Sequence, residues 1–187
     1  MSWENFCKVS NIGMRYHSVR CDRQTPELVA QGIDWINQPV SSVLTGDAGR
    51  GKTHFSLCLA KEAVRKFGIS NVIWFKSKRL DDEIVSCTKE FGSASYKIKT
   101  LSDVDILFID DFGMDRSTER AERDYYEIID TRWENYKVTV LSTNLTPKQI
   151  EKVYGARIYS RLKDFSWFLF NGPDLRGEED LQACVEA

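Results

Sequence analysis

A short glycine-rich motif restricts the fold of this chain more than any other feature of the sequence. Residues 46–53 read Gly-Asp-Ala-Gly-Arg-Gly-Lys-Thr, which fits the pattern G-x-x-x-x-G-K-[ST] at every defined position. Residues 41–45 predict a short strand before it, and residues 52–67 carry apolar side chains at helical spacing after it. Such a turn directs backbone N–H groups and the positive end of a helix at a phosphate. The motif therefore predicts a phosphate-binding loop rather than a chance glycine-rich turn.

The polar side chains of the motif suit a triphosphate with a magnesium ion. The Lys52 ammonium can bridge β- and γ-phosphates, and the Thr53 hydroxyl can ligate Mg²⁺. We therefore expect ATP and Mg²⁺ as ligands, with His54 in the first turn of the following helix. The candidate nucleotide-binding residues are Gly46, Asp47, Ala48, Gly49, Arg50, Gly51, Lys52, Thr53 and His54.

Polar side chains also follow two later strands. Asp110 and Asp111 come directly after the apolar residues 106–109, and Asn144 follows the apolar segment 138–142. Ligands of open α/β sheets bind at the carboxyl ends of the strands, so Asp110 is expected to coordinate Mg²⁺ directly or from the second shell. We expect Asp111 to act as general base or to orient the attacking water, and Asn144 to help position that water. The alternatives are solvated acids at a strand end and, for Asn144, an ordinary turn residue.

The rest of the chain alternates between strand and helix patterns. This alternation predicts an α/β fold, a three-layer α/β/α sandwich with a mostly parallel central sheet of unknown strand order. We expect a polar, irregular lead-in over residues 1–24, one ATPase domain over 25–177 and an acidic tail over 178–187. The long helix is expected to place Ile128, Trp133 and Tyr136 in the core. The predicted strands are 41–45, 72–75, 104–109, 138–142 and 167–170, and the predicted helices are 25–37, 52–67, 79–91 and 117–135, with one or two further helices over 147–163.

Composition excludes several other classes of protein. The formal net charge is −2, so any contact with nucleic acid must come from a local basic patch. The apolar stretches are far shorter than the ~20 residues that span a bilayer, and the N-terminus lacks a secretory signal, so we expect a cytoplasmic protein without membrane contact. The cysteines are scattered and odd in number, which favours reduced thiols and argues against zinc. They are Cys7, Cys21, Cys58, Cys87 and Cys184.

These elements, in this order and spacing, resemble AAA+ ATPases, and more narrowly the bacterial DnaC/DnaI helicase loaders and the IstB transposition helpers. The resemblance covers about residues 10–177, and it implies the AAA+ form of the P-loop NTPase fold. The acid pair and the phosphate loop are shared by many ATPases, so the Ser-Thr-Asn segment and the two arginines of the later block narrow the family. The segments that carry the resemblance are 12–16, 46–54, 109–113, 141–145 and 155–162.

The resemblance also implies roles for single residues. Asn144 matches the residue called sensor 1, and Arg161, with Arg157 as its companion, matches an arginine that reaches into the ATP site of a neighbouring subunit. A guanidinium suits this role because it is planar and permanently charged, and can stabilise charge on transferring phosphoryl oxygens. Arg176 matches a C-terminal arginine that could act as sensor 2. The alternative for Arg157 and Arg161 is a solvated pair on a helix surface.

The expected partners follow from the same resemblance. A helicase loader would assemble with itself in an ATP-dependent way, and would act on a replicative DNA helicase and single-stranded DNA in a bacterial, plasmid or phage system. Lys76, Lys78 and Arg79, with aromatic side chains nearby, suit backbone neutralisation and base stacking. The acidic residues 81–83 follow at once, so a solvated helix face with mixed charges is the alternative.

One departure from the family keeps other functions open. The loaders carry a helicase-binding region of many tens of residues before this core, whereas only about ten residues precede the matching segment here. An IstB-like transposition helper shares the core and differs in its partner. A nucleotide-gated interaction protein with little turnover is a further alternative. A small-molecule kinase also uses a phosphate loop, but no arginine-rich lid follows residue 113.

Overall fold

A parallel sheet forms the centre of the molecule. The computed structural model describes residues 2–21, 24–113, 118–172 and 174–175. All pairings in its five-stranded sheet are parallel, and the strand order is β2-β3-β4-β1-β5. The strands are β1 (Ser42–Gly46), β2 (Val72–Lys76), β3 (Ile106–Asp110), β4 (Val138–Thr143) and β5 (Ser166–Phe170).

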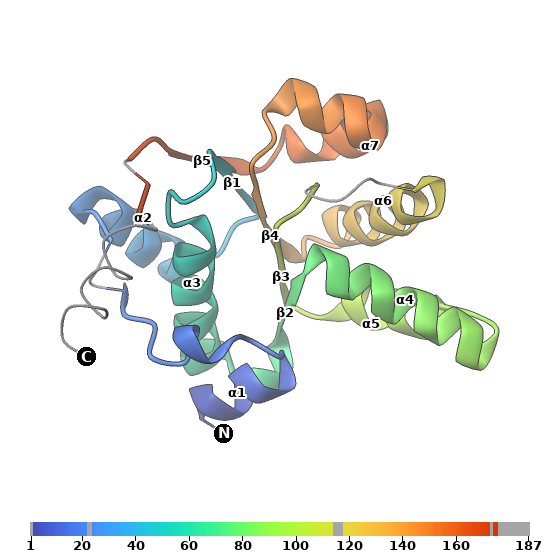
Figure 1. Ribbon diagram of the computed structural model, residues 1–187, viewed down its shortest axis with the longest axis horizontal. Helices are drawn as coiled ribbons and strands as arrows, with labels where there is room; N and C mark the ends of the chain where they lie inside the picture. The colour runs from blue at the N-terminus through green and yellow to red at the C-terminus, as the bar shows by residue number, and fades with distance from the viewer. Residues whose placement is uncertain (1, 22–23, 114–117, 173, 176–187) are drawn as a thin grey trace, which may run out of the picture.

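Helices cover both faces of the sheet, which makes three layers (Figure 1). Helices α1, α2 and α3 lie on one side of the strands, and α4 to α7 lie on the other. The three-layer α/β/α sandwich expected from the sequence is confirmed. The helices are α1 (Trp3–Val9), α2 (Pro26–Asn37), α3 (Lys52–Phe67), α4 (Ser77–Phe91), α5 (Ser95–Asp103), α6 (Glu119–Glu134) and α7 (Pro147–Leu162).

Alternate residues of the central strands enter two separate cores. Phe108 of β3 and Val140 of β4 pack with α3, whereas the neighbouring Leu107 and Leu141 pack with α6 and α7. Successive side chains of a strand point to opposite faces, so a strand covered on both sides is apolar at nearly every position. This burial explains why β3 has no polar residue before Asp110.

Local sequence signals set several helix ends. The Thr25 side chain accepts from the Leu28 N–H ahead of Pro26, which fits a capped helix start. Helix α7 begins with a capping box between Thr146 and Gln149. Gly155 interrupts α7 with φ 81°, so this element consists of two helical pieces joined at a kink.

The lead-in over residues 1–24 was expected to be polar and irregular, and this expectation is wrong for its first half. Helix α1 buries Phe6 and Cys7, and Ile12 and Val19 enter the same core as α3. Alternation between polar and buried positions over seven residues is too short to stand out as a helical period. The lead-in therefore packs as part of the α/β unit.

Two further expectations about helices need correction. Helix α5 was not predicted as a separate element, although it buries Ile98 and Leu101. On α6, Ile128 is buried as expected, but Trp133 is 38% exposed and Tyr136, just after the helix, is 95% exposed. The turn at Tyr136, with φ 54°, directs the chain towards β4 and places the ring outside the core. The acidic tail 178–187 lies outside the described residues.

Candidate nucleotide-binding site

The phosphate loop lies between the end of β1 and the start of α3. Gly46 has φ 146°, and a Cβ at this position would collide with the carbonyl oxygen of Phe170 on β5. Gly51 has φ 87°, a left-handed conformation that other residues adopt only with strain, and it is the residue before α3. The structure therefore explains why the motif has glycine at Gly46 and Gly51.

Lys52 folds back over the loop that it ends. Its side chain is 7% exposed, and Nζ donates hydrogen bonds to the carbonyl oxygens of Gly46 at 2.7 Å and Asp47 at 2.6 Å. An ammonium that is shielded from water and held by carbonyl groups at the N-terminus of a helix fits an anionic ligand. The residues of the loop therefore fit a nucleotide phosphate.

Thr53 and Asp110 join the phosphate loop to the acidic strand end. The Thr53 hydroxyl lies 3.1 Å and 3.0 Å from the two carboxylate oxygens of Asp110, across 57 residues of sequence. Asp110 is fully buried and also accepts a hydrogen bond from the Ser142 hydroxyl. A hydroxyl and a carboxylate are oxygen donors of the kind that Mg²⁺ prefers, so these side chains fit the expected metal.

Burial sets the charge state of Asp110. The pKa of Asp110 is raised to about 6, chiefly by desolvation and also by the nearby negative charge of Asp111. Hydrogen bonds from Ser142 and Thr53 lower this pKa by stabilising the carboxylate. Ser142 was quoted in the Ser-Thr-Asn segment but was not predicted as a site residue. Its place on β4, next to β3 in the sheet, brings its hydroxyl to the acid.

Asp111 follows in the turn after β3. It adopts φ 57°, and its N–H donates to Ser142 Oγ at 3.1 Å. Its carboxylate lies 3.6 Å from the Lys76 ammonium at the end of β2, and both side chains are about half exposed. Asp111 is therefore placed at the carboxyl edge of the sheet, paired with a cation that was considered as a DNA contact.

Asn144 begins the segment after β4, between the strands that carry the loop and the acids. The preceding Thr143 donates to the Phe112 carbonyl oxygen at 2.6 Å, and the following Leu145 accepts at its carbonyl from Thr45 Oγ1 at 3.0 Å. Because β4 lies between β1 and β3, these contacts place Asn144 at the edge where both half-sites meet.

The two arginines of α7 belong to the helix layer on the sheet face opposite α3. Arg161 and Arg157 contact α6, and the core under α6 and α7 is on the sheet face opposite α3. Within the described part of the chain, none of their hydrogen bonds, ion pairs or ring contacts reaches residues 46–53. The structure therefore does not bring them to the phosphate loop of their own chain. Arg176 lies outside the described residues.

The segment after β5 crosses the phosphate loop, a contact that sequence reasoning missed. The Leu175 N–H donates to the Gly49 carbonyl oxygen at 2.9 Å, and Arg50 donates to the carbonyl oxygen of Gly172. The Asp174 carboxylate lies directly against Gly49. No local pattern in the sequence indicates this contact, because it joins residues more than a hundred positions apart.

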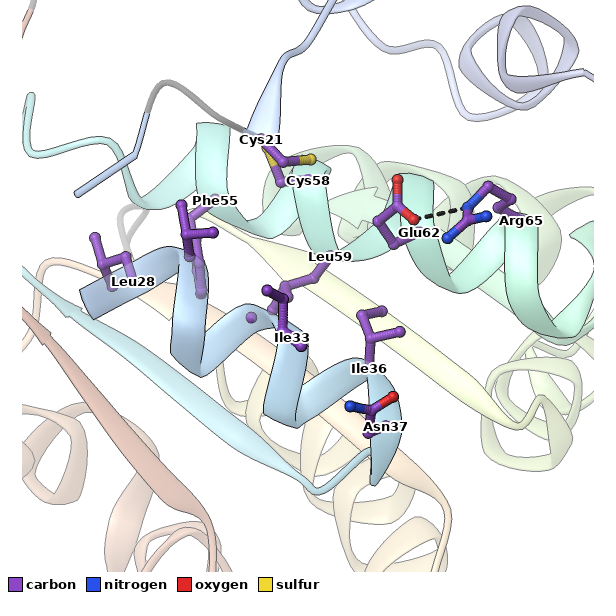
Figure 2. Close-up of a pocket in the computed structure, with 12 residues that line it drawn as sticks. Cys21, Leu28, Ile33, Ile36, Asn37, Phe55, Cys58, Leu59, Glu62 and Arg65 are labelled. Carbon is purple, nitrogen blue, oxygen red and sulfur yellow. Dashed lines mark hydrogen bonds and ion pairs between the residues drawn. The ribbon is translucent and has the colours of Figure 1, made fainter. Parts of the chain in front are cut away.

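An apolar cavity lies between α2 and α3 (Figure 2). Its volume is about 330 Å³, and an ion pair between Glu62 and Arg65, 2.7 Å long, lies on its rim. His54 donates to the carbonyl oxygen of Arg20 at 2.9 Å. This hydrogen bond joins the segment that precedes α2 to the first turn of α3. The apolar lining comes chiefly from Leu28, Ile33, Ile36, Phe55 and Leu59.

The basic residues after β2 are largely paired within the chain. Glu83 accepts from Arg79 at 2.9 Å and from Lys97 at 2.5 Å, and both cations lie over the Phe75 ring. Lys78 is exposed. Pairing with acids reduces the local positive potential, so DNA contact by this segment stays a prediction.

The sequence model of the IstB-like ATP binding protein family matches residues 8–161. The chain belongs to this family. Among curated relatives of the IstB-like chain, an ATP-binding protein of insertion sequence IS1162 from Pseudomonas fluorescens is 34% identical over 112 residues, which cover 60% of this chain and 47% of that protein. The chromosomal replication initiator protein DnaA of Deinococcus deserti is 27% identical over 124 residues, covering 66% of this chain and 26% of that protein. The IstB-like chain thus spans about half or less of the length of these relatives.

Solved structures share the fold of the IstB-like chain. The crystal structure of the DnaC helicase loader has a TM-score of 0.76 at 20% identity, and the match covers 85% of this chain and all of that one. AMPPCP-bound DnaA from Aquifex aeolicus has a TM-score of 0.69 at 20% identity, covering 88% of this chain and 52% of that one. The expected AAA+ type of P-loop fold is confirmed.

Within the described residues, no helix has the length and apolarity to cross a bilayer.

Proposed function

We propose that this chain binds Mg·ATP at residues 46–53 and hydrolyses it as an ATPase of the helicase-loader type, acting in DNA replication on a replicative helicase and single-stranded DNA. The family is one of ATP-binding proteins, and the fold matches that of the DnaC helicase loader. The observation that carries the proposal is the contact of the Thr53 hydroxyl with both carboxylate oxygens of Asp110. This contact joins the two half-sites on which the nucleotide chemistry depends.

Each side chain has a role that its surroundings support. Lys52 would exchange its two carbonyl partners for phosphate oxygens, and loop N–H groups would surround the β-phosphate. Thr53 and Asp110 would hold Mg²⁺, which neutralises charge on the phosphates when bound. Asp111 would accept a proton from water at the exposed end of β3, and Asn144 would orient that water.

The position of Arg161 supports a role on a neighbouring molecule. It lies on the helix layer opposite α3, in contact with α6 rather than with the phosphate loop. We therefore propose that Arg161, with Arg157 beside it, reaches the ATP of a neighbouring copy, so that hydrolysis depends on assembly. Sedimentation with a non-hydrolysable ATP analogue should show larger species than without nucleotide. A chain that stays monomeric at all concentrations of analogue would exclude this arrangement.

Nucleotide binding and hydrolysis can be tested separately. Lys52→Ala should abolish the calorimetric heat of Mg·ATP binding, whereas Asp111→Asn should bind ATP with unchanged affinity and hydrolyse it at least about 100-fold more slowly. Lys66→Ala, which removes an exposed lysine from the far end of α3, is the matched control and should leave both properties unchanged. An Asp111→Asn variant with wild-type turnover would show that Asp111 is not the base.

A transposition helper is the second candidate function, and the IS1162 relative favours it. The two functions differ in the partner protein rather than in the nucleotide chemistry. Capture by the tagged chain, with and without ATP, should retain a replicative helicase if the chain is a loader and a transposase if it is a helper. ATP-dependent capture of the transposase alone would reject the loader function.

A further inference from the structure

We infer that Asp130 and Trp133 of α6 are positioning residues that hold the Arg161 guanidinium ready to contact a phosphate of a neighbouring copy. The inference rests on the proposed role of Arg161 in trans. It adds to that role a reason why this arginine, and not Arg157, would contact the phosphate. It also assigns a function to two residues that belong to neither half-site.

A short ion pair fixes one side of the guanidinium. Arg161 Nε donates to Asp130 Oδ1 at 2.6 Å, and this contact joins α7 to α6 across 31 residues of sequence. The two side chains are 28% and 20% exposed, so the pair is partly shielded from water and salt. The hydrogen bond to Asp130 raises the pKa of Arg161, which is the direction expected for a guanidinium beside a carboxylate.

An aromatic ring fixes the plane of the same guanidinium. The Arg161 guanidinium carbon lies 4.4 Å from the centre of the Trp133 ring, a cation–π contact. The ring is itself held, because Trp133 Nε1 donates to Asp164 Oδ2 at 3.0 Å. The Asp164 N–H in turn donates to the Arg161 carbonyl oxygen at 3.2 Å. The contacts close a loop that constrains both the backbone and the side chain of Arg161.

Asp130 binds Arg161 in a way that leaves the terminal nitrogens of the guanidinium available for a phosphate. A carboxylate that sequesters an arginine engages two nitrogens of the fork, whereas Asp130 is bonded through Nε. Among the described residues, none accepts a hydrogen bond from the terminal nitrogens of Arg161. These nitrogens form the pair of parallel donors that match two phosphate oxygens. Asp130 therefore orients Arg161 without occupying the donors that a phosphate needs.

Arg157 provides an internal comparison. It lies one turn earlier on α7, with its guanidinium carbon 5.8 Å from the centre of the Tyr126 ring. No carboxylate within the described residues forms an ion pair with it, and its side chain is exposed. An arginine held in one orientation loses less rotamer freedom on binding than a mobile one. The geometry therefore assigns the phosphate contact to Arg161 and a supporting role to Arg157.

A double-mutant cycle on the full chain tests the inference. Arg161→Ala should lower the kcat of ATP hydrolysis on the order of 10³-fold, and Asp130→Ala should lower it about 10- to 100-fold, since a small misplacement of a contacting group is costly. KM for ATP should change by less than about twofold in both, because the neighbour's arginine acts in the transition state. The double variant should be no slower than Arg161→Ala alone. Asp130→Asn, which keeps an oxygen acceptor for Nε, should recover most of the loss.

A control separates positioning from a general loss of stability. Asp124→Ala removes a 2.9 Å ion pair with Arg120 from the same helix, away from Arg161, and should leave kcat unchanged. In ¹⁵N-labelled protein the Arg161 Nε–H signal should be protected from solvent exchange in the wild type and lost in Asp130→Ala.

The outcomes distinguish the inference from the function on which it rests. If Arg161→Ala is slow but Asp130→Ala turns over at the wild-type rate, Asp130 does not position the arginine and the trans role stands. If the effects of Asp130→Ala and Arg161→Ala multiply, Asp130 acts elsewhere and the inference is again overturned. If Arg161→Ala retains wild-type turnover, the proposed trans role of Arg161 fails and the inference fails with it, whereas hydrolysis itself stands. If the wild-type protein has no turnover, the proposed function fails.

Discussion

The fold buries the Asp110 carboxylate, although an ionised carboxylate is more stable in water. A buried carboxylate is favoured in its neutral form unless hydrogen bonds or cations compensate. Asp110 is fully buried, and the hydroxyls of Thr53 and Ser142 compensate only in part, since its pKa remains raised to about 6. A bound Mg²⁺ would reverse this balance. The residue is therefore expected to cost stability in the free protein and to contribute it in the Mg·ATP complex.

Replacing Asp110 should therefore stabilise the nucleotide-free protein. The folded pKa of about 6 lies above the ordinary value of 3.8, so the acid's contribution to stability is present below pH 4 and is lost as pH rises through 6. Asp110→Asn should raise the free energy of unfolding at pH 7 by roughly 2 kcal/mol, because it remains neutral. Urea unfolding at pH 4 and pH 7 without magnesium measures this, with the exposed Asp82→Asn as control. A variant less stable than wild type at pH 7 would contradict the argument, and binding of Mg·ATP should be lost in either case.

At the scale of elements, a buried arginine joins α6 to the sheet. Arg132 has no exposed surface, and its guanidinium donates to the carbonyl oxygens of Leu101 at 2.7 Å, Val104 at 2.7 Å and Val138 at 2.5 Å. Nε donates to Thr139 Oγ1 at 2.8 Å. These acceptors end α5, precede β3 and begin β4, so one side chain satisfies the backbone where three elements meet.

Removing this arginine should loosen the helix layer that carries Arg161. Arg132→Met keeps much of the volume but leaves buried carbonyl groups without a donor, so the free energy of unfolding should fall by about 3 kcal/mol. Arg123→Met changes an exposed arginine on the same helix and should have little effect. Guanidinium chloride unfolding of the two variants provides the comparison. Equal stabilities for both would show that water satisfies the carbonyl groups in the variant.

The packing of helix α1, which was expected to be an irregular lead-in, leads to a testable prediction. Phe6 is 2% exposed and stacks on Trp3 with ring centres 5.4 Å apart. Phe6→Ala should therefore lower the free energy of unfolding by about 3 kcal/mol, the usual cost of such a cavity. Val9→Ala, at a position that is 75% exposed on the same helix, should have little effect. If Phe6→Ala is as stable as Val9→Ala in thermal melts, α1 does not belong to the core.

The elements that sequence analysis predicted are those with long or repeated signals. Strands β2, β3 and β5 are apolar on nearly every residue, β1 and β4 each carry a short apolar stretch, and α3 follows a defined motif, so these elements were predicted within two residues of their observed ends. Helices α1 and α5 are short and carry few buried positions, and were missed. The residues of the site also fall into those that the sequence predicted and those that it did not. Thr53 and Asp110 belong to motifs, whereas the contacts of Ser142 with Asp110 and of Leu175 with Gly49 arise only when the sheet assembles.

At the scale of the whole molecule, the sheet separates two groups that the proposed reaction needs together. The phosphate loop leads into α3 in one helix layer, and Arg161 lies in the last turn of α7 in the other. A head-to-tail interface, in which the α7 side of one copy faces the phosphate loop of the next, would bring them together. Such an interface uses different surfaces on its two sides, so it extends to a ring or a filament rather than closing as a twofold dimer.

This arrangement predicts complementation between two inactive variants. Lys52→Ala chains should lack bound ATP but still supply Arg161, whereas Arg161→Ala chains should bind ATP but offer no arginine to their neighbour. Each variant alone should be nearly inactive. In an equal mixture, random assembly through a heterologous interface places an ATP-competent chain beside an arginine donor at about a quarter of the interfaces, so turnover should recover to about a quarter of the wild-type rate. Steady-state hydrolysis over a range of mixing ratios measures this, and should be greatest near equal amounts. A mixture that stays as inactive as its components, although sedimentation shows mixed assemblies, would place Arg161 outside the neighbour's ATP site.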